Sequence, residues 1–198
     1  MPHYYYKKYP YLNYPYLDED GEPWIMFSIP AYALANMYKQ RLGTMPQSFF
    51  DCGAAVGELV RQADEIGMDA RGIDIRQYPF DVRHAKYFKS GRIQIKSILD
   101  CDPIKSDLAY CNGTLTYMDQ KTLPLALSKF KNVGMLIAAH NTTEDIEAAR
   151  AQGDDLQYCS EPRLIKSRDW WMNSFVKNGF LPDWDSKYQC FCAIPKTR

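Results

Sequence analysis

The chain of 198 residues has no apolar run long enough to cross a membrane, and no apolar segment near its N-terminus that would mark a secretion signal. We therefore expect a soluble, cytoplasmic protein with no membrane partner. The sequence also has no excess of either charge, because 24 basic side chains balance 24 acidic ones. This balance argues against a large basic surface for duplex nucleic acid, but it leaves a local basic patch open.

Cysteine shows no pattern typical of a zinc ribbon or of a small disulfide scaffold. The six cysteines are scattered at Cys52, Cys101, Cys111, Cys159, Cys190 and Cys192. Most lie in or beside predicted strands, so we expect buried free thiols and no metal site. Cys190 and Cys192 point to one face of a strand, where core packing is their expected role. No serine or cysteine nucleophile motif is present.

The stretch from Phe49 to Gly57 carries the most informative local pattern. Two aromatics lead into Asp51, small residues follow, and apolar residues after Gly57 recur at helical spacing until Gly67. This pattern predicts a strand, a tight turn and a helix. The turn leaves bare backbone N–H groups at the helix N-terminus, where a ligand can approach. Further along, Asp74 ends a short apolar run and is placed to accept hydrogen bonds from ribose hydroxyls.

These residues resemble a known family. The segment Asp-Cys-Gly-Ala-Ala-Val-Gly from Asp51 is similar to the first motif of class I S-adenosylmethionine (SAM)-dependent methyltransferases, Asp-x-Gly-x-Gly-x-Gly, with Ala55 in place of the middle glycine. Asp74 matches the acid that ends their second strand. A nicotinamide-binding unit needs Gly-x-Gly-x-x-Gly, and small residues at Gly53, Ala55 and Gly57 do not meet that spacing.

Strand and helix patterns alternate regularly along the chain, which indicates parallel strands with right-handed crossovers. We expect strands from Phe49, over 70–74, 92–98, 106–111 and 132–139, then a hairpin of 180–184 and 187–194. We expect helices over 31–42, 81–88 and 121–130, and another after Ser167 in which Trp171, Phe175 and Val176 pack inward. The fold class is α/β: a Rossmann-like, seven-stranded, mostly parallel sheet with helices on both faces and a C-terminal antiparallel hairpin.

The resemblance implies SAM as the cofactor and gives its contacts, which gather at the carboxyl ends of the strands. The implied cofactor-binding residues are Asp51, Gly53, Ala54, Ala55, Gly57, Asp74, Ile75, Ser97, Ile98, Asp100, Asn112 and Gly113. Ser97 and Ile98 offer backbone contacts to the adenine, and Asp100 lies two residues beyond the place where relatives keep an acid. Asn112 and Gly113 line the methionine end.

Two residues are candidates for catalysis. Tyr117 is expected to face the methyl group or the acceptor. His140 follows the fifth strand, where a histidine faces the cleft with a pKa suited to proton transfer; the alternative is a histidine that only hydrogen-bonds a loop. His3 and His84 have no acidic or nucleophilic companion in the sequence that suggests a site.

The first 28 residues differ from the rest. Seven of the fifteen tyrosines lie within the first sixteen residues, among several prolines that prevent a helix. We divide the chain into an N-terminal arm, 1–28, and a methyltransferase domain, 29–198. The arm is either a strap pinned to the domain surface, a lid over the acceptor, or a stacking surface for bases.

Three functions remain open. The first is methyl transfer to a small, sugar-like acceptor. The second is methylation of RNA or a protein side chain: the motif also resembles that of ribosomal RNA 2′-O-methyltransferases, in which Asp107 or a neighbour would supply an acid, although the fifth strand lacks the matching lysine. The third is a non-catalytic SAM-binding or interaction protein. The Asn/Asp-Pro-Pro-Tyr/Phe sequence of amino-methylating DNA enzymes is missing from the fourth strand. The oligomeric state is left open.

Overall fold

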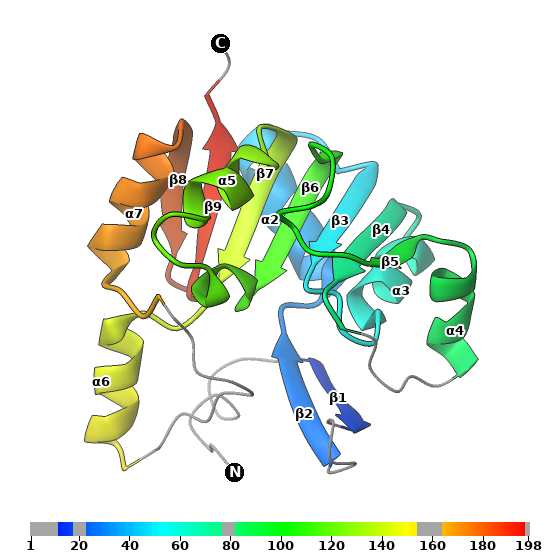
Figure 1. Ribbon diagram of the computed structural model, residues 1–198, viewed down its shortest axis with the longest axis horizontal. Coiled ribbons are helices and arrows are strands. Elements are labelled where there is room, and N and C mark those ends of the chain that lie inside the picture. Colours follow the sequence, from blue (N-terminus) through cyan, green and yellow to red (C-terminus); the bar gives the residue numbers. More distant parts are fainter. Residues whose placement is uncertain (1–11, 18–22, 77–81, 154–163, 197–198) are drawn as a thin grey trace.

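The computed structural model describes residues 12–17, 23–76, 82–153 and 164–196, and these contain one seven-stranded sheet in the order β5-β4-β3-β6-β7-β9-β8. Its strands are β3 (Ser48–Cys52), β4 (Asp69–Asp74), β5 (Ile93–Ile95), β6 (Lys105–Asn112), β7 (Asn132–Ala139), β8 (Phe180–Asp185) and β9 (Cys190–Pro195). The first five are parallel, whereas β9 runs antiparallel to both β7 and β8. The predicted α/β fold with its C-terminal hairpin is confirmed (Figure 1).

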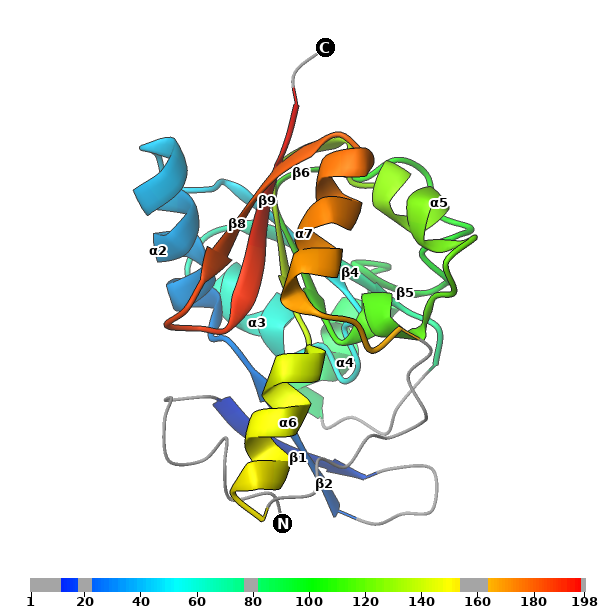
Figure 2. The ribbon, with the colours of Figure 1, turned by 90° about the vertical axis from the view of Figure 1, so that its left-hand side faces the viewer.

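Helices cover both faces of the sheet, as predicted (Figure 2). They are α2 (Ala31–Leu42), α3 (Glu58–Glu65), α4 (Val82–Lys89), α5 (Leu123–Ser128), α6 (Thr143–Ala151) and α7 (Arg168–Lys177), and a short 3₁₀ helix, η1 (Thr114–Tyr117), follows β6. One apolar cluster packs α2, α3 and α4 against the sheet, and a second packs α5 and α7 against the opposite face. Burial of these two faces is the main source of favourable folding free energy.

Three predicted details are wrong. The third strand ends at Ile95, because the chain turns at Ser97, whose carbonyl accepts the N–H of Asp100 (3.1 Å). Val176 is 45% exposed, since it lies about 100° around α7 from the buried Phe175. The hairpin turn is longer than predicted, because β9 begins only at Cys190. Within the turn, the Asp185 carboxylate accepts the N–H groups of Lys187 and Tyr188 (3.1 Å each).

Ahead of the domain, β1 (Leu12–Leu17) and β2 (Pro23–Ser28) pair antiparallel in a sheet of their own. Both views place this pair beyond the carboxyl ends of β6 and β7 (Figures 1 and 2). Ser28 Oγ and the Ile29 N–H donate to the buried Tyr110 hydroxyl on β6, at 3.3 and 3.4 Å. Most of the tyrosine-rich arm lies outside the described residues, and the division at residue 28 stays a prediction.

Among the described residues, no helix combines the length and apolar character required to cross a membrane. The five described cysteines are buried and free, as predicted; Cys159 lies outside the described residues. Those residues also contain no cluster of three or more His, Cys, Asp or Glu side chains arranged to hold a metal ion.

Candidate functional site

The side of the sheet on which β3, β4, β6 and β7 end, here called the carboxyl edge, gathers most of the predicted cofactor residues. The turn after β3 has left-handed backbone at Gly53 (φ 91°) and Gly57 (φ 88°). A Cβ at Gly53 would collide with the Thr114 hydroxyl, and one at Gly57 with the Ile93 side chain. Both positions therefore require glycine for conformation and for space.

Several backbone donors of the turn are already engaged within the protein. The N–H groups of Gly53 and Ala54 donate to the Ile73 carbonyl (2.8 and 2.9 Å), and that of Gly57 donates to the Ala54 carbonyl (2.7 Å). These donors hold the turn against β4. The predicted role of the backbone N–H groups that open α3 stays a prediction.

Ala55 adopts a left-handed backbone conformation, which glycine accommodates without strain. Its φ is 46°, in the left-handed region that non-glycine residues seldom adopt. This conformation directs the Ala55 N–H to Asp74 Oδ2 at 2.8 Å. The alanine is thus held by the acid of the neighbouring strand, and the motif turn is preserved at the cost of local strain.

Asp74 ends β4 and is 8% exposed. Its other oxygen accepts the Arg76 N–H at 3.0 Å. Burial raises the pKa of Asp74, and these backbone hydrogen bonds oppose the rise. A carboxylate has about four lone-pair sites, so these backbone contacts leave capacity for a ribose hydroxyl. The next residue, Ile75, is 65% exposed and offers an apolar surface beside them.

Asp51 is the most unusual acid of the site. It lies at the end of β3, is 3% exposed, and receives neither a hydrogen bond nor an ion pair from the described residues. Burial, and then repulsion from Asp74, raises its pKa to about 8. A cation or a hydrogen-bond donor of a ligand would complement this largely buried carboxyl group.

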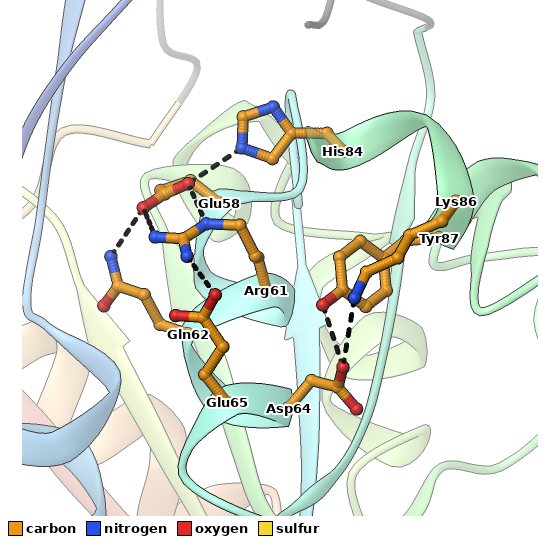
Figure 3. A network of polar contacts seen from close by, with 8 residues as sticks. All are labelled: Glu58, Arg61, Gln62, Asp64, Glu65, His84, Lys86 and Tyr87. Atoms are coloured by element: carbon orange, nitrogen blue, oxygen red, sulfur yellow. Dashed lines mark hydrogen bonds and ion pairs between the residues drawn. The ribbon is translucent and has the colours of Figure 1, made fainter. Parts of the chain in front are cut away.

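Behind the turn, α3 carries a polar network that sequence reasoning missed (Figure 3). The Glu58 carboxylate, 6% exposed, accepts hydrogen bonds from Arg61 Nε (2.8 Å) and Gln62 Nε2 (3.0 Å). It also contacts His84 Nε2 at 2.8 Å, so His84 does have an acidic companion. The contact crosses from α3 to α4, and no sequence pattern reports a pairing of that kind.

The charge of Glu58 also affects which acids of the carboxyl edge can face a ligand. Burial opposes ionisation of Glu58, but hydrogen bonds from Arg61 and His84 outweigh it and lower the pKa of that carboxyl. A negative charge therefore stands in the first turn of α3, with Asp51 and Asp74 nearby at the strand ends. The Glu58 charge is paired with Arg61 (2.6 Å), so Asp51 and Asp74 at the strand ends are the acids left to face a ligand.

The remaining predicted cofactor residues lie along the same edge. Ser97 and Asp100 bound the turn after β5; Ser97 is half-buried, Asp100 is exposed, and the Ile98 side chain is buried in the core. Asn112 ends β6 opposite Ala139, whose carbonyl accepts the Gly113 N–H at 2.7 Å. Thr114 Oγ1 donates to the Cys52 carbonyl (2.8 Å), which ties η1 to the motif turn.

The two candidates for catalysis differ in setting. Tyr117 is half-buried at the end of η1. His140 directly follows β7, but its ring packs between Trp171 and Phe191, at centroid distances of 4.1 and 5.1 Å. Burial lowers the pKa of His140 to about 3. The predicted pKa near neutrality is therefore wrong, and the ring is an uncharged, very weak base at pH 7.

Asp107 lies at the wrong end of the sheet for the acid of an RNA 2′-O-methyltransferase. It is the third residue of β6, and its Oδ2 accepts the N–H groups of Gln47 and Ser48 (2.7 and 3.0 Å) where β3 begins. These contacts hold the start of β3, which is the end of that strand opposite to the carboxyl edge. The observation removes Asp107 from that role.

Neither a protein-family model nor a curated protein sequence matches this chain. Solved structures do match its fold. A sugar N-methyltransferase from Streptoalloteichus is 12% identical over 84% of this chain and 87% of that chain, with a TM-score of 0.61. A 1,6-didemethyltoxoflavin-N1-methyltransferase from Burkholderia thailandensis, solved with 1,6-didemethyltoxoflavin and S-adenosylhomocysteine, is 14% identical over 84% and 78%, with a TM-score of 0.60.

A small RNA methyltransferase also matches, at 14% identity and a TM-score of 0.57, over 82% of this chain and 24% of that chain. At such identities the likeness establishes the fold. The chain has the fold of the class I SAM-dependent methyltransferases, with strand order and C-terminal hairpin included.

Proposed function

We propose that this protein transfers a methyl group from SAM to a small-molecule acceptor. The observation that carries the proposal is Asp51, an almost fully buried carboxylate without a partner, beside Asp74 and the tight turn that begins at Gly53. SAM carries a positive sulfonium, a positive α-ammonium group and two ribose hydroxyls. Asp74 at the end of β4 complements the ribose hydroxyls, and Asp51 at the end of β3, once it has lost its proton, complements a positive group of SAM.

Different residues along the carboxyl edge bind different parts of SAM. Asp74 accepts hydrogen bonds from the ribose hydroxyls, and the side-chain-poor turn lets the ligand approach the backbone. We assign the adenine end of SAM to Ile75, Ser97, Ile98 and Asp100. We assign its methionine end to Asp51, Asn112 and Gly113. When bound, SAM supplies a methyl group already activated by the sulfonium.

Because the donor is activated, the protein chiefly has to align the acceptor with it and exclude water. His140 is uncharged and weakly basic, so proton removal by this residue is not part of the proposal. An acceptor that attacks as a neutral amine needs no base before transfer. Tyr117, on η1 next to the methionine end, is proposed to face the acceptor.

A small acceptor is favoured over RNA on two grounds. The chain has no net charge, and the acid assigned to RNA 2′-O-methylation lies away from the carboxyl edge. Structures with the same fold include enzymes for a sugar and for a heteroaromatic amine. The non-catalytic alternative loses support because Ala55 keeps the motif's left-handed turn. A cytoplasmic location stays a prediction of the sequence.

Calorimetric titration with SAM and with S-adenosylhomocysteine tests the cofactor. We expect micromolar binding, and Asp74→Ala should weaken it by about 1.5–3 kcal/mol because a charge-assisted ribose contact is lost. Asp69→Ala is the matched control, since Asp69 begins the same strand and is exposed. Absence of binding, or equal losses in both variants, would contradict the proposal. Methyl transfer to amino-sugar and heteroaromatic panels would follow.

A further inference from the structure

Two buried side chains, one directly after β7 and one in α7, carry polar atoms that lack any hydrogen-bond partner in the described part of the chain. Both ring nitrogens of His140 and the indole Nε1 of Trp171 are buried in this way. The residues are 9% and 0% exposed, and their ring centroids lie 4.1 Å apart. The surrounding cluster is otherwise apolar, with Phe175 and Phe191 against Trp171.

Such an arrangement is unfavourable by itself. A buried donor or acceptor without a partner costs about 1–3 kcal/mol, and a phenylalanine of similar shape at position 140 would avoid the cost. The other described histidine shows the ordinary solution, because buried His84 is held by the Glu58 carboxylate. Unsatisfied polar groups in a core need an explanation, such as a bound ligand, a bound water molecule or strain that serves the function.

His140 lies next to the proposed cofactor site. His140 follows Ala139, which is paired with Asn112 at the methionine end of the proposed cofactor site. Trp171 stands in the first turns of α7, after the Ser167 cap. The chain before α7 is tied back to η1 by the Leu164 N–H, which donates to the Thr116 carbonyl at 2.8 Å. The His140 and Trp171 rings therefore meet where the end of β7 packs against α7, and the segment before α7 is tied to η1.

The chemistry of the pair is selective. Burial keeps the His140 imidazole uncharged at pH 7, so it has one donor and one acceptor nitrogen. The Trp171 indole adds one donor. A hydroxyl or a neutral amine, which both donates and accepts, can pair with one imidazole nitrogen and with the indole N–H. A carboxylate or an ammonium group would bring an unpaired charge into this largely apolar cluster, which is costly.

We propose that His140 and Trp171 bind an uncharged hydroxyl or amine group of the acceptor and thereby select a polar, uncharged small molecule. This inference rests on the proposed methyltransferase function. The nitrogen atoms of His140 and Trp171 are buried in this structure, so neighbouring side chains have to move when the acceptor binds. Trp170, half-buried and edge-on to Trp171 at 5.2 Å, is the neighbouring ring that reaches solvent.

The test follows the indole ¹H–¹⁵N resonance of Trp171, assigned with Trp171→Phe, in protein saturated with S-adenosylhomocysteine. The probes are D-glucosamine, methyl α-D-glucopyranoside and, as a charged control, cyclohexanecarboxylate. We expect saturable shifts with one or both sugars and none with the carboxylate. His140→Phe should weaken sugar binding about tenfold or more, while S-adenosylhomocysteine affinity changes less than twofold.

Thermal unfolding supplies a second readout. His140→Phe should raise the melting temperature by about 2–8 °C, because it removes an unpaired buried polar group, whereas His84→Phe should lower it by breaking the buried contact with Glu58. If no sugar shifts the Trp171 resonance, or if His140→Phe binds the sugars as the parent does, the pair holds only a buried water and the inference is overturned. Failure to bind S-adenosylhomocysteine would instead refute the proposed function, and this inference with it.

Discussion

Replacement of Asp51 by asparagine should change how the protein's stability depends on pH. Asp51 is 3% exposed and has a pKa of about 8, raised by burial and by repulsion from Asp74. An aspartate in an unfolded chain titrates near pH 4. Between about pH 4 and pH 8 the folded protein therefore retains a proton that the unfolded chain has released. The free energy of unfolding then falls as the pH rises through this window.

The magnitude follows from the width of the window. Each pH unit corresponds to about 1.4 kcal/mol, so four units give about 5 kcal/mol as an upper bound. Asparagine has nearly the same shape and does not ionise, so Asp51→Asn escapes this loss. We expect the stability of the variant relative to the parent to rise steadily from about pH 5 to about pH 8 and then to level off.

Urea unfolding at about pH 5, 6.5 and 8 measures the difference, with Asp102→Asn as the control because Asp102 is an exposed acid on a loop. The control should show a small difference at every pH. If the stability difference between Asp51→Asn and the parent did not change with pH, Asp51 would be ionised in the folded state across the range. The description of Asp51 as an unpartnered buried acid would then be refuted.

Three further outcomes follow from the same turn. SAM affinity in the parent should rise about 50-fold from pH 6 to pH 8 if Asp51 must lose its proton to face a cation, and a flat calorimetric profile would contradict this. Ala55→Gly should stabilise the protein by up to about 1 kcal/mol in urea unfolding, because glycine relieves the φ of 46°; a loss of stability would count against strain at Ala55. Gly53→Ala should destabilise by more than about 2 kcal/mol through its collision with Thr114, and Thr114→Ala in the same chain should recover part of the loss; additive effects would show that the collision is absent.

The sequence by itself determined the order and type of nearly all elements. Their signals are local: apolar spacing within one helix, an apolar run within one strand, and Gly43 or Gly67 where a helix stops. The same locality explains why the motif turn and Asp74 were found, since they adjoin strand ends that share one edge. The shorter third strand was missed because pairing with a single neighbour, rather than propensity, decides where β5 ends.

Only the tertiary structure decided the state of the charged and polar groups. The pKa of His140 depends on Trp171 and Phe191, which come from distant parts of the chain, and that of Asp51 on the depth at which the sheet buries it. The Glu58–His84 contact joins residues 26 positions apart. Burial and distance between elements set these properties, because the cost of removing a charge from water depends on everything packed around it. The sequence located the site, and the packing determined which of its groups can carry charge.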